Sequence, residues 1–252
     1  MDPQYVVGID IGSSYAKAVL LDEKLNICAQ SIIKSGIDFT LAAEESFKNL
    51  NVEKDRVSKI VATGVGRNNC TFADFVKPEI NCLTRGAFHF YPRQITVVDI
   101  GGQDNKIIHI DNSGKQVSFK LNRKCASGTG SFLEEMAFKL NISVIEMNKR
   151  AQETKKSVGI GSFCTVFAGT EIIQHIREGK AVNGIIRGIF DSVIKRILEM
   201  ENLNNDIILT GGAIVHAPIL KVILEEKTSQ KVYSPKEAQL IGAVGAALYG
   251  II

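Results

Sequence analysis

The chain has 252 residues, of which 45% are hydrophobic, enough to bury the core of one large domain or of two small ones. Its formal net charge is +3, and acidic and basic residues are interleaved without a run of one sign. This pattern argues against a nucleic-acid-binding or membrane-surface protein. The first residues contain no basic segment and no long apolar stretch, so neither a signal peptide nor a transmembrane helix is predicted, and a cytoplasmic location is expected.

In chain order, the predicted elements form two similar successions. The first part is expected to hold strands at about 5–10, 15–22, 26–33 and 57–63, and helices near 40–50 and 79–90. The second part restarts with strands at about 94–100, 105–110, 115–121 and 206–210, and with helices near 129–140, 143–152, 166–178, 182–201, 216–226 and 236–249. This order predicts a duplicated α/β fold with a ligand cleft between two halves, residues 1–93 and 94–252.

Two short segments repeat one another where predicted strands end. Residues 10–22 read DIGSSYAKAVLLD and residues 99–111 read DIGGQDNKIIHID. A constant offset of 89 residues pairs Asp10 with Asp99 and Lys17 with Lys106. Each copy lies between two apolar runs, so each is predicted to be a strand, a tight glycine turn and a second strand.

The residue types in the two turns suit the binding of one triphosphate. Gly12 in the first copy, and Gly101 with Gly102 in the second, allow backbone N–H groups to approach an anion closely. Ser13 and Ser14 add hydroxyl donors in the first turn. The alternative is two ordinary glycine hairpins, and the presence of two copies in register favours phosphate binding.

Charged and amide side chains near the turns are candidates for the chemistry. Asp10 and Asp99 are expected to hold Mg²⁺ through its water ligands, beside phosphate oxygens. Gln103 is the candidate for orienting the attacking water, because a carboxamide both donates and accepts hydrogen bonds. The alternative for Gln103 is an ordinary polar turn residue. Lys17 and Lys106 are either phosphate partners or solvated strand ends.

A third glycine segment, residues 209–213 with the sequence LTGGA, ends a predicted strand and opens a predicted helix. Gly211, Gly212 and Ala213 are expected to lie against the adenosine, with the helix N-terminus directed at the ligand. The alternative is a plain strand-to-helix turn. The chain lacks the G-x-x-x-x-G-K-[ST] motif, which excludes the P-loop mode of nucleotide binding.

These three segments resemble the two phosphate loops and the adenosine loop of the sugar kinase, heat-shock protein 70 and actin superfamily. The resemblance implies a duplicated actin-like (ribonuclease H-like) ATPase fold that binds ATP or ADP.

A narrower resemblance covers nearly the whole chain. It is to the ATPase activators, or component A, of 2-hydroxyacyl-CoA dehydratases, which are related to the ATPase subunits of benzoyl-CoA reductase. The matching residues are VDIGGQD at 98–104, KCASGTG at 124–130 followed by Phe132 and Leu133, and CTVFA at 164–168.

The narrower resemblance implies a metal cofactor and a dimer. In that family a [4Fe–4S] cluster lies between two identical subunits, and the two cysteines that each subunit gives match Cys125 and Cys164. Four thiolates from two chains require a two-fold axis through the cluster. Both cysteines precede predicted helices, whose N-terminal N–H groups favour thiolates. The alternative is that both are buried as small apolar residues. Cys28, Cys70 and Cys82 are expected to be structural, and the odd total of five predicts no disulfide framework.

The function implied by the resemblance is ATP-dependent, one-electron activation of a partner enzyme. The reduced homodimer would receive an electron from a ferredoxin or flavodoxin, dock on a dehydratase or reductase and pass the electron on with ATP hydrolysis. This chain departs from the family pattern at Ser131, where arginine is common, and at residues 168–171, which read AGTE in place of AESE. The alternatives are a small-molecule kinase with the same ATP cleft and a non-redox ATP-binding regulator.

Overall fold

The computed structural model describes residues 4–123, 126–161 and 164–251, which divide into two compact units. Unit 1 comprises Met1–Gln94, Ile110–Val117 and Gln239–Ile252, and unit 2 comprises Ile95–His109 and Ser118–Ala238. The predicted halves, 1–93 and 94–252, have nearly the same first boundary. They differ from the observed units in two segments, 110–117 and 239–252, which belong to unit 1 because their backbone neighbours lie there.

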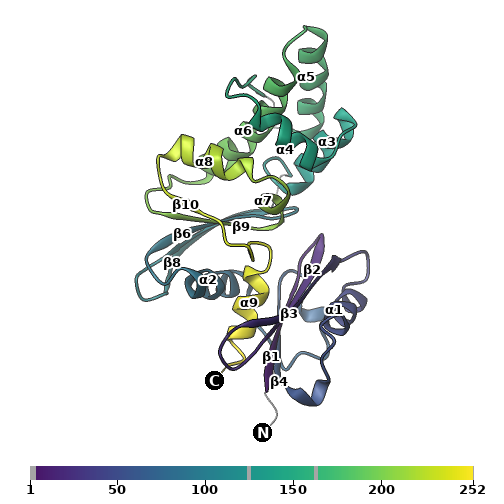
Figure 1. The fold of residues 1–252 in the computed structure, drawn as a ribbon, viewed down its shortest axis with the longest axis vertical. Coiled ribbons are helices and arrows are strands. Elements are labelled where there is room, and N and C mark those ends of the chain that lie inside the picture. The colour runs from purple at the N-terminus through teal and green to yellow at the C-terminus, as the bar shows by residue number, and fades with distance from the viewer. Residues whose placement is uncertain (1–3, 124–125, 162–163, 252) are drawn as a thin grey trace. The chain divides into compact units, whose positions relative to one another are not determined.

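Unit 1 is built on a five-stranded sheet in the order β3-β2-β1-β4-β5 (Figure 1). The strands are β1 (Tyr5–Ile11), β2 (Tyr15–Leu21), β3 (Ile27–Lys34), β4 (Val57–Thr63) and β5 (Phe75–Val76). The helices are α1 (Phe39–Lys48), α2 (Glu79–Phe90) and α9 (Ile241–Leu248), with 3₁₀ turns at Lys54–Arg56 and Arg67–Asn69. Strand β1 pairs antiparallel with β2 and parallel with β4, so it lies at the centre of the sheet.

Strand β1 is almost wholly buried because both of its faces are covered. Successive side chains of a strand point to opposite faces of the sheet. Ile9 packs on one face in a cluster with Ala43 of α1, and Val6 packs on the other face with Ala243 of α9. The continuous apolar run that predicted this strand therefore reflects burial on both sides rather than on one.

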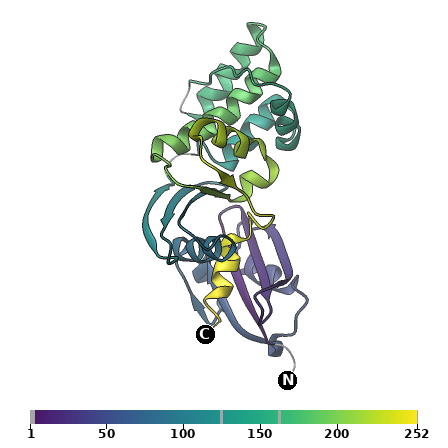
Figure 2. The same cartoon turned by 60° about the vertical axis from the view of Figure 1, so that its left-hand side comes forward.

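Helix α9 is buried along its whole length between β1 and α2 (Figures 1 and 2). Glycines make this approach possible. A Cβ atom on Gly8 of β1 would overlap the carbonyl oxygen of Ala243, and one on Gly245 of α9 would overlap the carbonyl oxygen of Cys82. The backbone of α9 thus packs directly against both neighbours.

Unit 2 contains a second five-stranded sheet, in the order β10-β9-β6-β7-β8. The strands are β6 (Ile95–Ile100), β7 (Asn105–Ile110), β8 (Gln116–Asn122), β9 (Ile207–Thr210) and β10 (Val232–Tyr233). The helices are α3 (Gly130–Leu140), α4 (Val144–Gln152), α5 (Thr165–Arg177), α6 (Val182–Met200), α7 (Gly212–His216) and α8 (Ile219–Thr228). Read from β8, the order matches that of the first sheet read from β3, so the duplicated α/β fold predicted from the sequence is confirmed.

The differences from the predicted elements are local. Strands β5 and β10 have two residues each and carry too short a pattern to be predicted. The helix expected near 216–226 is α8, which begins at Ile219, and the short α7 before it ends ahead of Pro218, because proline disfavours a continuing helix. Across the described ranges, no helix combines the length and the apolar character that crossing a bilayer requires.

The packing of α9 gives a test of this fold. We expect Gly245→Ala to lower the free energy of unfolding by about 2 kcal/mol or more, although alanine is the better helix former, because the new methyl group overlaps the backbone of α2. Gly159→Ala is the control, since no atom lies within 4 Å of its added Cβ, and its effect should stay within about 0.5 kcal/mol. Urea unfolding measures both, and equal stabilities would contradict the packing described here.

Candidate functional site

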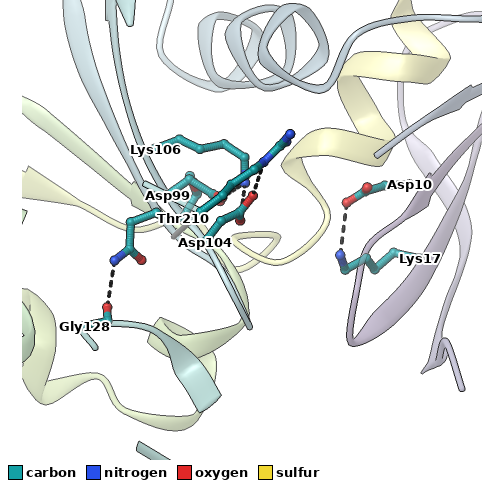
Figure 3. A network of polar contacts seen from close by, with 9 residues as sticks. Asp10, Lys17, Asp99, Asp104, Lys106, Gly128 and Thr210 are labelled. Atoms are coloured by element: carbon teal, nitrogen blue, oxygen red, sulfur yellow. Dashed lines mark hydrogen bonds and ion pairs between the residues drawn. The ribbon is translucent and has the colours of Figure 1, made fainter. Parts of the chain in front are cut away.

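The turn between β1 and β2 is the first part of the candidate site. Asp10 and Lys17 are register partners in these strands, and the Lys17 Nζ lies 3.0 Å from the Asp10 Oδ2 (Figure 3). Gly12 closes the turn by donating its N–H to the carbonyl oxygen of Tyr15 at 3.0 Å. The first copy of the sequence repeat is therefore a hairpin whose base is fixed by an ion pair.

The turn between β6 and β7 repeats this geometry. The Lys106 Nζ lies 3.1 Å from the Asp99 Oδ2, and Gly101 donates its N–H to the carbonyl oxygen of Asp104 at 2.9 Å (Figure 3). Neither Lys17 nor Lys106 is a solvated strand end, because each ammonium group is engaged with the aspartate of its own repeat.

Ser35 orients the peptides of the first turn. Its Oγ donates to the carbonyl oxygen of Gly12 at 2.7 Å, and its N–H donates to the carbonyl oxygen of Ser14 at 3.0 Å. In a trans peptide the C=O and the following N–H point in opposite directions. The N–H groups of Ser13 and Tyr15 therefore point away from Ser35.

The N-terminus of α3 orients the second turn in the same way. Gly130 donates its N–H to the carbonyl oxygen of Gly101 at 2.9 Å. Ser131 donates both its N–H and its Oγ hydrogen to the carbonyl oxygen of Gly102, at 2.9 and 2.7 Å. The N–H groups of Gly102 and Gln103 consequently point away from α3. Successive N–H groups on one side of a turn form a concave site for an anion, which suits phosphate oxygens.

The two hairpins differ in one carboxylate. Asp104 occupies the place that Tyr15 has in the first copy, and its Oδ1 lies 2.7 Å from the Lys106 Nζ. The Asp104 Oδ2 accepts a hydrogen bond from the Arg123 Nε at 3.1 Å. With two carboxylates around it, the side chain of Lys106 is 1% exposed, against 14% for Lys17. Sequence reasoning assigned no role to Asp104 or Arg123, although the missing counterpart of Asp104 in the first copy was a visible signal.

A threonine and a glycine lie at the end of the strand that pairs parallel with the central strand of each sheet. Thr63 is the last residue of β4 and Thr210 that of β9, and Gly64 and Gly211 follow them. The two glycines have φ of +90° and +97°, and an added Cβ would overlap the carbonyl oxygen of Ile11 or Ile100, respectively. Only glycine accepts both the positive φ and this close approach. The prediction identified residues 210–211 but missed 63–64, whose signal was the shared Thr-Gly pair.

Asp10 and Asp99 differ in the hydrogen bonding of their Oδ1 atoms. The Thr210 Oγ1 donates to the Asp99 Oδ1 at 2.8 Å, whereas the equivalent Thr63 hydroxyl donates to the carbonyl oxygen of Lys77 at 2.9 Å. The Asp10 Oδ1 is buried and has no hydrogen-bond partner among the residues that the structure describes. Since a buried carboxylate oxygen normally has a partner, Asp10 retains the capacity to accept a hydrogen bond from a ligand's water.

The segment predicted to contact adenosine lies beside a hollow of about 350 Å³ in unit 2. Gly211 donates its N–H to the carbonyl oxygen of Ala238 at 3.0 Å, and α7 begins at Gly212, with Ala213 buried in its first turn. The hollow is lined by apolar and basic side chains, among them Ile214, Val215, Pro218, Pro235, Lys221 and Lys236. Its composition suits an aromatic base with an anionic tail.

Of the two cysteines assigned to the cluster, the structure describes one. Cys164 is a free, exposed thiol at the N-cap of α5, and its carbonyl oxygen accepts the N–H of Ala168 at 2.8 Å. The N–H groups of the first turn of a helix have no intrahelical partner, so a thiolate here lies in a favourable field. Cys125 lies outside the described residues. Gln103, the candidate for orienting water, is exposed at the tip of the second turn.

Helix α5 also exposes large apolar side chains near Cys164. Val166 and Phe167 are 69% and 67% exposed, and Ile173 and Ile176 are exposed farther along the helix. Gly169 of the same helix leaves room for the side chain of Lys139, because a Cβ atom at position 169 would overlap that side chain. An exposed apolar patch of this kind is typical of an interaction surface.

The chain matches the BadF/BadG/BcrA/BcrD ATPase family over residues 7–250. It belongs to this ATPase family. A solved structure of the activator of 2-hydroxyisocaproyl-CoA dehydratase from Clostridium difficile, with bound ADPNP, has a TM-score of 0.89 at 33% identity, covering 98% of this chain and 94% of that one. Component A of (R)-2-hydroxyglutaryl-CoA dehydratase from Acidaminococcus fermentans has a TM-score of 0.90 at 36% identity, covering 98% and 97%.

The activator of lactoyl-CoA dehydratase from Anaerotignum propionicum is also similar, with 36% identity over 251 residues that cover 97% of this chain and 96% of the relative. The family resemblance read from the sequence is thereby confirmed, and so is the actin-like ATPase fold class. The roles of individual residues in this family member remain predictions.

The burial of two cysteines predicts a pattern of thiol reactivity. Burial raises the pKa of the Cys70 thiol to about 11 and that of Cys82 to about 12. At pH 8 their thiolate fractions are therefore on the order of 10⁻³ and 10⁻⁴. We expect iodoacetamide to modify the exposed Cys28 in the folded protein while Cys70 and Cys82 stay unmodified, as measured by mass spectrometry of digests. Urea-unfolded protein is the control, and rapid labelling of Cys82 in the folded state would contradict this burial.

Proposed function

We propose that this chain is an ATP-dependent activator of a 2-hydroxyacyl-CoA dehydratase-type enzyme and that it couples ATP hydrolysis to the transfer of one electron. One observation carries the proposal: each unit of an ATPase-family chain holds an aspartate–lysine hairpin whose turn peptides are oriented for an anion. The relatives reported above are named as activators or components of such dehydratases.

ATP and ADP are the proposed nucleotides. Gly12, Ser13 and Ser14 of the first turn would bind phosphate oxygens together with Gly101 and Gly102 of the second. Lys17, which pairs with Asp10, would contribute its ammonium group at the first turn. Gly211, Gly212 and Ala213 would lie against the adenosine, beside the hollow that Ile214 helps to line. The ADPNP in the similar Clostridium difficile activator supports an adenine nucleotide as the ligand class.

Magnesium is proposed to bind with the nucleotide. Asp10 and Asp99 would hold it, and the unused Oδ1 of Asp10 fits a cation that keeps several of its waters. Gln103 would orient the attacking water. The water oxygen attacks the γ-phosphorus, the bond to the β-phosphate oxygen breaks, and ADP and inorganic phosphate result.

A [4Fe–4S] cluster bridging a homodimer is proposed as the redox group. Cys125 and Cys164 would supply its thiolates, and the exposed thiol of Cys164 at a helix N-terminus fits this role. Such a cluster supplies one-electron chemistry. The apolar surface of Val166 and Phe167 beside Cys164 fits the burial that a dimer contact requires. The electron donor is proposed to be a ferredoxin or flavodoxin, the acceptor a dehydratase or reductase, and the location the cytoplasm.

The assignment of Asp10 is tested by kinetics with magnesium and ATP. We expect Asp10→Asn to lower kcat for ATP hydrolysis by on the order of 10²-fold, because the metal and the γ-phosphate lose their positioning. Asp22→Asn is the matched control, since Asp22 lies at the other end of the same hairpin. Hydrogen bonds from Asn26 lower the pKa of the Asp22 carboxyl group. Its kcat should equal that of the wild type. Equal rates in all three proteins would exclude the proposed role, and calorimetry showing no nucleotide binding would exclude the function.

The cluster is tested by iron and sulfide analysis of anaerobically purified protein, together with the oligomer mass. We expect about four irons per dimer in the wild type, none in Cys164→Ala and the wild-type amount in Cys28→Ala, whose thiol is also exposed. Iron retained by Cys164→Ala would exclude this ligand. An iron-free wild type that phosphorylates a small molecule would indicate a kinase, and one that binds ATP without turnover would indicate a regulator.

A further inference from the structure

The residues on either side of 124–125 are both held by the second hairpin. On the N-terminal side, the Arg123 Nε donates to the Asp104 Oδ2 at 3.1 Å. On the C-terminal side, the Asn105 Nδ2 donates to the carbonyl oxygen of Gly128 at 2.9 Å, and Ser131 binds the carbonyl oxygen of Gly102. The turn that presents N–H groups for an anion is therefore connected directly to residues 126–131, hereafter the cysteine-flanking segment.

Asp104 is shared between the turn and this segment. One of its oxygens binds Lys106 and the other binds Arg123, while Lys106 is also held by Asp99 (Figure 3). An anion at the second turn would attract the Lys106 ammonium group and so compete with Asp104 for it. With a weaker bond to Lys106, the Asp104 carboxylate would be available for a stronger interaction with Arg123. Within the described part of the chain, the first hairpin has no equivalent connection, because Tyr15 stands in the place of Asp104.

We propose that Arg123 is a positioning residue that couples nucleotide bound at the second hairpin to the order of the cysteine-flanking segment. The inference rests on the proposed function, since it requires a nucleotide phosphate at this turn. Arg123 touches neither phosphate nor metal in this scheme. It acts through Asp104, and it gives the hairpin a charged contact with the chain that leads to Cys125.

The test is hydrogen–deuterium exchange of the full-length protein, followed in peptides that report residues 126–135. Three states are compared: no nucleotide, magnesium with ADP, and magnesium with a non-hydrolysable ATP analogue. In the wild type, the analogue should slow exchange in these peptides. In Arg123→Gln, the analogue should bind with a dissociation constant within about threefold of the wild type, while at least about half of the nucleotide-dependent difference in exchange is lost. Arg123→Lys keeps the charge and should restore part of that difference.

Arg150→Gln is the matched control. It removes another exposed arginine of unit 2, whose Nε lies 2.9 Å from the Glu146 Oε1, and it should leave the nucleotide-dependent difference unchanged. A purely structural role of Arg123 would raise exchange equally in all three states and keep the difference between them, which would overturn the inference.

Asp104→Asn is a second variant that should reproduce the effect of Arg123→Gln. It replaces Arg123→Gln in the experiment if the Arg123 variant is unstable. A wild type that binds no nucleotide in calorimetry would overturn the proposed function itself, whereas binding with an unaltered response in both variants overturns only the role of Arg123.

Discussion

An ion pair between the first two strands of each unit is the interaction on which the candidate site depends. Asp10 with Lys17, and Asp99 with Lys106, hold the ends of two strands together directly beneath a glycine turn. The second pair is almost wholly buried, so removal of Lys106 would leave the Asp99 carboxylate without its cation, at a cost on the order of 3–5 kcal/mol. With the strand ends fixed in this way, a few donors from outside each turn suffice to orient its peptides. The anion-binding geometry is thus a property of the fold rather than of flexible side chains.

The two hairpins share this architecture but differ in what surrounds the carboxylates. In the first, Asp10 keeps a buried oxygen that no described residue binds, which fits the coordination of a hydrated cation. In the second, Thr210 occupies the equivalent oxygen of Asp99, and Asp104 links the hairpin to Arg123. The two copies of the repeat therefore form similar hairpins whose carboxylates have unequal surroundings. Only the first hairpin leaves a buried carboxylate oxygen of its aspartate without a partner among the described residues, and only the second is joined through Asp104 to Arg123.

The sequence predicted the parts of this structure that depend on local pattern. Apolar periodicity located the long strands and helices, and the 89-residue repeat placed both aspartates and both lysines at equivalent positions. The pairing of Thr210 with Asp99, and of Arg123 with Asp104, was beyond such reasoning because these contacts join residues that are distant in sequence and carry no periodic signal. The Thr-Gly pair at 63–64 was missed for a related reason. Its significance appears only when the parallel pairing of β1 with β4 brings Gly64 against Ile11.

The burial of α9 in unit 1 has a consequence for biosynthesis. Residues 241–248 pack in a core with Val6, Val19 and Leu21 of the first strands, so a ribosome must synthesise nearly all of unit 2 before unit 1 acquires its last helix. Until then, the apolar surface of β1 that faces α9 lacks its native cover. Unit 1 therefore cannot complete its core during translation until the residues that follow unit 2 have been synthesised.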